Sequence, residues 1–281
     1  MSALTGRATI VYATAWMQGE GKTSGSRAVD IGPRDVPRVI EVAGSAEQDE
    51  LDLVLHLSGG SVEGAMGVMG YLRQRFSHIR VVVPMATRST GTMLALGGDE
   101  IVMGPLARLG RIGPGFATYP SGCGPWERRD GAGTNATAPS DSKASEEWLP
   151  VLRGLSPCSL AYSIRRMSRT MSLMERWLMG YMFSDIPERD RGDQARAVTD
   201  WFFDFARREL PGPRSGSFAD LEKRGLRVTR LDDDVRLCDA VLSVYHAVQL
   251  TFSSTFSEKI IDSNVGKGAS ERFGQNASEC A

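Results

Sequence analysis

Ser89 is the residue of this chain best placed to act as a nucleophile. It follows the apolar run 81–83 and Pro84, which predict a buried strand, and it precedes the helix formers 93–96, which Gly97 ends. At such a strand-to-helix turn the unpaired N–H groups of the first helical turn stabilise developing negative charge. The arrangement favours acyl transfer through the hydroxyl. The alternative role for Ser89 is a helix N-cap, which serine commonly provides.

A glycine turn upstream can supply the second part of an acyl-transfer site. The run 51–57 predicts a strand, and a helix is expected over about 62–76. Between them the N–H groups of Gly59 or Gly60, together with that of Thr90, can point at an oxyanion. Two successive strand-turn-helix units bring this turn and the Ser89 hydroxyl to the same edge of a sheet. The predicted site is therefore Ser89 with Gly59, Gly60 and Thr90 as backbone donors.

The order and spacing of these motifs resemble the Clp protease/crotonase superfamily. The similarity is greatest to its serine dehydrogenase proteinase family, which is related to signal-peptide peptidase A. The segments that carry it are Ser58-Gly59-Gly60, Ser89-Thr90-Gly91-Thr92, 98–103, 109–115, 177–183 and later stretches to about residue 266. The resemblance implies an α/β fold with a Clp/crotonase-like repeated strand-turn-helix (ββα) core and appended C-terminal helices. It also implies a serine peptidase that acts on a peptide or protein substrate.

A serine nucleophile requires a general base, and the sequence offers several candidates for it. Superfamily members use a lysine or a histidine-aspartate pair. The separation of Lys143 from Ser89 along the sequence resembles that of the serine-lysine dyad in signal-peptide peptidase A. A solvated loop lysine is the alternative. His56, on the strand before Gly59, and His246, on the last expected helix, are alternative bases or structural histidines. Lys259 matches a family lysine near the C-terminus and is expected at a helix end.

Two departures from the family pattern keep a second function open. The family's Pro-Ile-Asp-Pro-Gln segment is replaced here by 111–115, which lacks its carboxylate and amide, and Arg88 precedes Ser89 where the family has a small apolar residue. A guanidinium there could bind an acidic substrate or point into solvent. The alternative function is a catalytically inactive Clp/crotonase-fold protein that serves as an oligomeric scaffold or binds peptides.

Composition excludes several other classes of protein. With 281 residues and 41% hydrophobic content the chain can bury a large core, and its net charge of −1 does not indicate nucleic-acid binding. No apolar run approaches the ~18–20 residues of a membrane span, which predicts a cytoplasmic protein. The four cysteines show no metal-ligand spacing, and Gly19–Thr23 lacks the first glycine of a phosphate loop because that position is Trp16. We therefore expect no metal and no cofactor.

A single domain over residues 1–268 is predicted, with a core over about 7–115 and a helical part over about 146–268. The Gly-, Ser- and Pro-rich stretch 112–145 is expected to be a mobile loop beside the site, and 269–281 a flexible tail. Helices are expected over 144–155, 159–183, 194–210, 218–224 and 235–252, and a short strand over 226–231. The apolar stripes of 159–183 and 194–210 exceed what one small sheet can cover, which predicts a homo-oligomer.

Overall fold

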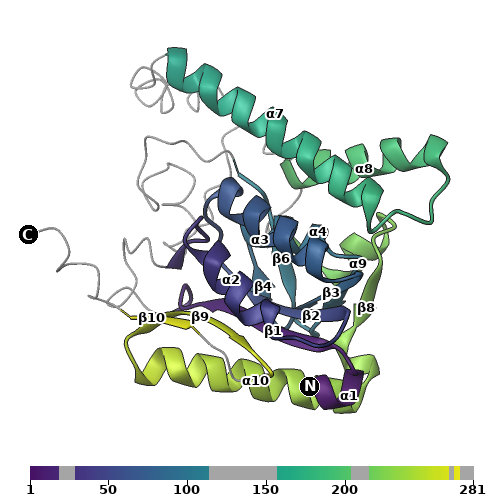
Figure 1. Ribbon diagram of the computed structural model, residues 1–281. Helices are drawn as coiled ribbons and strands as arrows, with labels where there is room; N and C mark the ends of the chain where they lie inside the picture. The colour runs from purple at the N-terminus through teal and green to yellow at the C-terminus, as the bar shows by residue number, and fades with distance from the viewer. Residues whose placement is uncertain (19–28, 114–156, 204–214, 266–268, 273–281) are drawn as a thin grey trace, which may run out of the picture.

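A computed structural model describes residues 1–18, 29–113, 157–203, 215–265 and 269–272 of the chain (Figure 1). The predicted loop 112–145 and helix 144–155 lie almost entirely outside these residues, and so do Lys143 and most of the predicted tail. No helix in the described part of the chain is both long enough and apolar enough to cross a membrane.

A mixed seven-stranded sheet forms the centre of the molecule, with the strand order β10-β9-β1-β2-β3-β5-β8. Five neighbouring strands are parallel: β1 (Ala8–Thr14), β2 (Glu50–His56), β3 (His78–Val83), β5 (Glu100–Met103) and β8 (Val228–Arg230). At one edge β9 (Ser257–Ser263) and β10 (Ala269–Arg272) add antiparallel. Six of the seven β2 residues are buried, as expected for a parallel strand that is covered on both faces. The predicted α/β class is confirmed.

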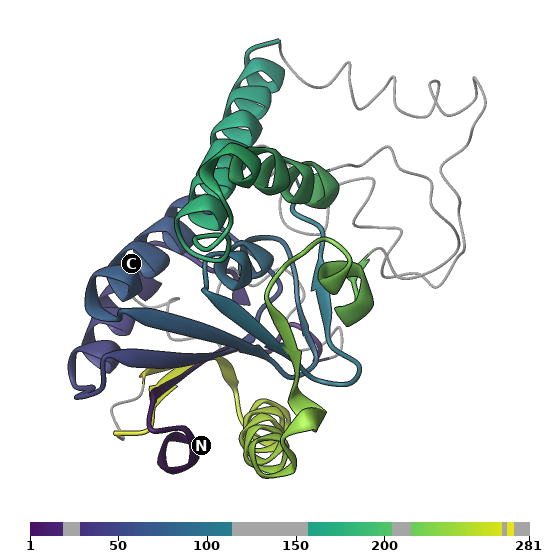
Figure 2. The ribbon, with the colours of Figure 1, turned by 90° about the vertical axis from the view of Figure 1, so that its right-hand side faces the viewer.

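Helices cover both faces of the sheet. The helices α2 (Asp35–Gly44), α3 (Val62–Arg75) and α4 (Thr90–Leu96) lie on one face, and α10 (Val235–Ser254) lies on the other (Figure 2). Strand β2 shows how the sequence encodes this, because its side chains alternate between the two layers. Leu53 and Leu55 join the large core under α3 and α4, whereas Val54 packs with Leu237 and Val241 of α10.

The remaining elements are two further helices, a small second sheet and a few short elements. The long helix α7 (Pro157–Gly180) and α8 (Glu188–Phe203) pack beyond α3 and α4, on the side away from the sheet (Figure 1). A second, three-stranded sheet joins β4 (Ala86–Thr87), β6 (Arg108–Gly110) and β7 (Ser215–Gly216). The short elements are α1 (Ser2–Thr5), α9 (Phe218–Glu222) and the 3-10 turn η2 (Leu231–Asp233). The expected appended helices are therefore present.

Three details differ from the sequence-based expectations. Residues 269–272, expected in a flexible tail, form β10, because their backbone pairs with the open edge of β9. Lys259, expected at a helix end, lies on β9, opposite Thr14 of β1. Helix α8 begins at Glu188 rather than at residue 194, and Glu188 and Asp190 favour its first turn by opposing the helix dipole.

Candidate active site

Two chain turns meet at the carboxyl ends of β2 and β3. Gly59 follows β2, and Ser89 lies between β4 and α4. A Cβ atom built on Gly59 would lie 2.9 Å from the Cβ atom of Ser89 and 3.3 Å from its Oγ atom. Gly59 also has φ of 140°, which side-chain-bearing residues rarely adopt. The structure thus brings together the glycine turn and the serine, and only glycine fits at position 59.

The backbone of Ser89 is strained. Its φ is 50° and its ψ is −119°, and no other non-glycine residue in the described part of the chain has a positive φ. Such conformations cost roughly 1–3 kcal/mol and cluster at functional sites. A serine held on a sharp strand-to-helix turn presents its hydroxyl outward, as in the nucleophile elbow of the α/β-hydrolases.

The Ser89 side chain does not cap α4. Ser89 occupies the N-cap position, but its hydroxyl accepts no hydrogen bond from the first turn, and its own N–H donates to the carbonyl oxygen of Arg111 at 3.1 Å. By contrast, the Ser61 hydroxyl accepts from the Gly64 N–H and caps α3. The N-cap alternative for the Ser89 side chain is therefore wrong. Its hydroxyl is left available for chemistry.

Segment 30–35, which we call the strap, fixes the glycine turn. The N–H of Ile31 donates to the Gly59 carbonyl, and the Ser61 N–H donates to the Ile31 carbonyl, both at 2.7 Å. In this bridge the N–H of Gly60, between the two bonded residues, points away from Ile31. A Cβ atom on Gly60 would lie 2.3 Å from both the nitrogen and the oxygen of Ile31. Gly60 is thus required by the close approach of the strap.

Backbone donors remain at this junction. Among the described residues, no hydrogen-bond acceptor within geometric limits faces the N–H groups of Gly59, Gly60 or Thr90. Unpaired N–H groups beside a strained serine are the elements that stabilise the oxyanion of an acyl transfer. The arrangement can hold a polarised carbonyl group next to a hydroxyl nucleophile.

His56 is buried on the face of the sheet opposite to α4. It is 2% exposed, and its ring lies 5.4 Å from that of Trp16 and 5.3 Å from that of Tyr245 on α10. Neither ring nitrogen has a hydrogen-bonding partner within the described residues, so His56 makes no hydrogen bond to Ser89. Burial lowers the pKa of His56 to about 4, although the nearby Ala86 backbone partly opposes that shift.

The buried histidine makes stability depend on pH in a defined window. Unfolded His56 titrates near 6.5 and folded His56 near 4, so between these values the unfolded state binds more protons. We expect the free energy of unfolding to fall by about 3 kcal/mol as the pH drops from 6.5 to 4. His56→Gln should remove most of this slope in urea titrations at several pH values. His246→Gln, a change of an exposed histidine on α10, should leave it in place, and an unchanged slope in His56→Gln would contradict the assignment.

The other two candidate bases are not seen beside Ser89. His246 is exposed on α10, where its ring lies 6.0 Å from that of Tyr245, and α10 covers the sheet face opposite to α4 (Figure 2). Lys143 lies outside the described residues. The described part of the chain therefore places Ser89 and the backbone donors together, with neither histidine beside the serine.

Arg88 stacks on Trp16 beside Ser89, a contact that the sequence did not indicate. The exposed guanidinium of Arg88 lies 4.9 Å from the ring centre of Trp16, which follows β1 and also contacts His56. Stacking on an aromatic ring holds a guanidinium without neutralising it. A cation thus stands one residue before Ser89. The departure of Arg88 from the family pattern was visible in the sequence, but its stacking partner was not.

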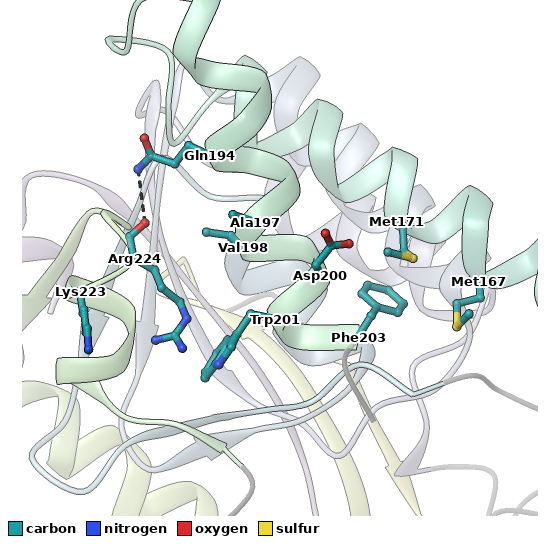
Figure 3. A pocket seen from close by; sticks show the side chains of 10 residues that line it. All are labelled: Met167, Met171, Gln194, Ala197, Val198, Asp200, Trp201, Phe203, Lys223 and Arg224. Carbon is teal, nitrogen blue, oxygen red and sulfur yellow. Dashed lines mark hydrogen bonds between the residues drawn. The ribbon is translucent and has the colours of Figure 1, made fainter. Parts of the chain in front are cut away.

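A pocket of about 730 Å³ lies between α7, α8 and the residues that follow α9 (Figure 3). Met167, Met171 and Phe203 line one side of it, and Arg224 stacks over Trp201 at 3.8 Å on the other. Ser89 is not among the lining residues. The chain connects the two places, because the Ser89 N–H bonds to Arg111 and the N–H of the next residue, Ile112, bonds to the Phe202 carbonyl at 3.1 Å.

Comparison with known proteins identifies the segment that builds this junction. Residues 29–124 match the family model of the ClpP-like SDH-type serine proteinases. This confirms the resemblance drawn from the motifs. The matched segment contains the strap, Gly59, Gly60, Ser89 and Thr90, and it ends before Lys143.

Curated relatives match over a similar length. Two uncharacterised proteins of Methanocaldococcus jannaschii, MJ0137 and MJ1495, are 33% and 27% identical over 95 residues, or 34% of this chain. The match spans only 29% and 28% of their lengths. The match therefore covers less than a third of the length of each relative.

Three solved structures with a similar arrangement share little sequence with this chain. A mutant of the 1510-N membrane-bound stomatin-specific protease has a TM-score of 0.42 at 14% identity, covering 82% of each chain. A second mutant of that protease, in complex with a substrate peptide, has a TM-score of 0.40 at 15% identity, covering 71% of this chain and 70% of its own. The ClpP protease catalytic domain of Plasmodium falciparum has a TM-score of 0.37 at 9% identity, covering 71% and 79%.

Proposed function

We propose that this protein is a serine peptidase in which Ser89 is the nucleophile. The observation that carries the proposal is the backbone of Ser89, held at φ 50° with its hydroxyl released from capping and lying against Gly59. Because the strained Ser89 does not cap the helix with its side chain, the strain indicates a functional role. The family match of residues 29–124 supports the same reaction class.

The proposed reaction follows the usual order of acyl transfer. Ser89 Oγ attacks the carbonyl carbon of the peptide, and its proton passes to a general base. The N–H groups of Gly60 and Thr90, with Gly59 as an alternative donor, bind the resulting oxyanion. The base then protonates the departing amine as the C–N bond breaks. A water molecule, deprotonated by the same base, releases the acyl group from the serine.

We propose Lys143 as that base. His56 is a poor candidate because it lies on the face of the sheet away from α4, with its ring against those of Trp16 and Tyr245 and without a hydrogen bond to Ser89. His246 is exposed on α10. A lysine acts as a base only when desolvation lowers its pKa enough to leave it neutral. The proposal therefore requires that Lys143 enter a dry site beside Ser89.

The substrate we propose is a peptide or an unfolded protein segment. The exposed cation of Arg88, held over Trp16, favours a carboxylate near the scissile bond. A library of fluorogenic peptides with acidic and neutral residues around that bond tests both activity and preference. Ser89→Ala should reduce hydrolysis by roughly 10⁶-fold. Ser77→Ala, at the other end of β3, should have no effect.

The library also tests the alternative function. If wild-type protein binds library peptides but cleaves none of them, the catalytically inactive scaffold or peptide-binding protein replaces the peptidase. If hydrolysis persists in Ser89→Ala, the assignment of the nucleophile is wrong.

We also propose that the protein is a homo-oligomer. Large apolar side chains remain exposed on several elements, including Ile164 of α7 at 51%, Leu250 of α10 at 67% and Phe256 at 71%. Such side chains can contribute to an interface where they lie in one patch, and closed symmetry is the usual form of assembly. Light scattering at micromolar concentration should give a multiple of the 30.5 kDa chain mass. A monomeric mass would contradict this expectation.

A further inference from the structure

A buried polar network lies behind the strap, outside the groups assigned to the reaction. Lys259 Nζ of β9 lies 2.8 Å from Asp35 Oδ1 and 3.0 Å from Oδ2. Tyr12 of β1 donates its hydroxyl hydrogen to Asp35 Oδ2 at 2.5 Å. The three residues are 3%, 1% and 0% exposed, in that order. The Lys259–Asp35 ion pair and the Tyr12 side chain are thus almost completely removed from solvent.

The network holds the two residues of the strap that flank Ile31. Lys259 Nζ donates to the Asp30 carbonyl at 2.8 Å, and the Gly32 N–H donates to Asp35 Oδ2 at 2.8 Å. Asp30 and Gly32 flank Ile31, whose N–H and carbonyl both bond the glycine turn. The network therefore fixes the orientation of Ile31 from one side. On the other side, the two backbone hydrogen bonds of Ile31 hold Gly59 and Ser61 in place.

The strap has no room to move without displacing the turn. A Cβ atom on Gly64, in the first turn of α3, would lie 2.7 Å from the carbonyl carbon of Gly32, and one on Gly60 would lie 2.3 Å from Ile31. The other anchor, Lys259, belongs to the sheet, since it pairs with Thr14 of β1. A continuous set of contacts thus runs from β9 through Asp35 and Ile31 to Gly60.

Stability alone does not account for a charged pair at this place. Desolvation of two buried charges offsets most of their attraction, and apolar residues of similar volume often stabilise a fold as well or better. Directional bonds to Asp30 and Gly32 are what an apolar pair could not supply. The network therefore fixes a geometry, and that geometry includes the direction of the Gly60 N–H.

We infer that Asp35, Lys259 and Tyr12 are positioning residues that aim the Gly60 N–H at the reacting carbonyl. The inference rests on the proposed peptidase function for the role of that N–H. None of the three residues touches the substrate. They act through Ile31, and their loss should slow formation of the acyl-enzyme without abolishing peptide binding.

The test compares this network with a matched buried pair that does not reach the strap. Asp52 is 0% exposed and receives two hydrogen bonds from Arg80, at 2.7 and 2.9 Å, across β2 and β3. The variants are Asp35→Asn, Lys259→Met and Tyr12→Phe, with Asp52→Asn and Arg80→Met as controls. Two kinds of measurement are made on the full-length protein. The first is hydrogen exchange of the Ile31 and Ser61 amides. The second is reactivity, given by the rate of fluorophosphonate labelling and by kcat and KM for a cleaved peptide.

We expect exchange at Ile31 and Ser61 to accelerate in the network variants and to stay at the wild-type rate in the controls. Labelling and kcat should fall by roughly 100-fold in Lys259→Met with KM nearly unchanged, and less in Tyr12→Phe, which removes one bond. Unchanged exchange at both amides, or equal loss of labelling in the controls, would overturn the inference.

The two readouts separate this inference from the proposed function. If the wild-type protein is neither labelled nor active, the peptidase proposal fails, while exchange at Ile31 and Ser61 still decides whether the network orients the turn. Should the charge variants fail to fold, Tyr12→Phe gives the same comparison, because it leaves the Lys259–Asp35 pair intact.

Discussion

Gly60→Ala is expected to slow acylation of Ser89 by roughly 10²–10³-fold, equivalent to the loss of one oxyanion donor, about 2.7–4 kcal/mol. The added methyl group would lie 2.3 Å from the backbone nitrogen and oxygen of Ile31, and neither atom can yield without moving the strap. Residue 60 also has φ of 141°, which alanine rarely adopts. The turn should therefore rotate and carry its N–H away from the oxyanion.

Gly70→Ala is the matched control for this change. Gly70 lies in α3, where a Cβ atom meets nothing within 4 Å, and alanine is the better helix former by about 1 kcal/mol. The control should be at least as stable as wild type and should react at the wild-type rate. Labelling rates are compared at a temperature where thermal unfolding shows all proteins to be folded. A wild-type rate in folded Gly60→Ala would remove Gly60 from the oxyanion site.

Lys143→Ala is expected to reduce peptide hydrolysis to the background rate, a loss of roughly 10⁶-fold. Lys143→Arg should be equally inactive, because a guanidinium stays protonated and cannot accept the Ser89 proton. In the wild-type protein activity should rise with pH, since the neutral amine is the active form and predominates only above its pKa.

The pH profile distinguishes Lys143 from His56. If His56 were the base, activity would rise through a midpoint near 4, the pKa that burial gives this histidine, and would be flat above it. His56→Gln would then abolish hydrolysis. Full activity in Lys143→Ala would show that the lysine is not the base, whatever the profile.

Local patterns in the sequence were sufficient to predict the architecture and the meeting of the glycine turn with Ser89. The alternating and apolar runs before Gly59 and before Ser89 predicted two strands that end at the same edge of a sheet. The structure shows this meeting, because a Cβ atom built on Gly59 would lie 2.9 Å from the Cβ atom of Ser89. The same runs matched the family model over residues 29–124.

Features that depend on distant contacts could not be predicted. Asp35 and Lys259 are 224 positions apart, and no local periodicity marks a pair that forms only when β9 closes on β1. Strand β9 mixes polar with apolar residues, so its pattern did not separate strand from helix.

Backbone geometry set a second limit on prediction. A serine before a helix predicts a cap, and only its φ and ψ reveal that the Ser89 hydroxyl turns away from the first turn of α4. Likewise, strand alternation placed His56 on one face of the sheet, but only the folded chain shows that this face belongs to α10.

The most direct test of Ser89 as the nucleophile is covalent labelling of the intact protein with a fluorophosphonate, followed by mass spectrometry of its peptides. We expect one adduct per chain, on Ser89, which is lost in Ser89→Ala, retained in Ser77→Ala and formed more slowly in Gly60→Ala. Peptide hydrolysis should disappear in step with labelling. Folded protein that acquires no adduct at Ser89 across the alkaline pH range, or that still cleaves peptides after Ser89 is replaced, would contradict the assignment of Ser89.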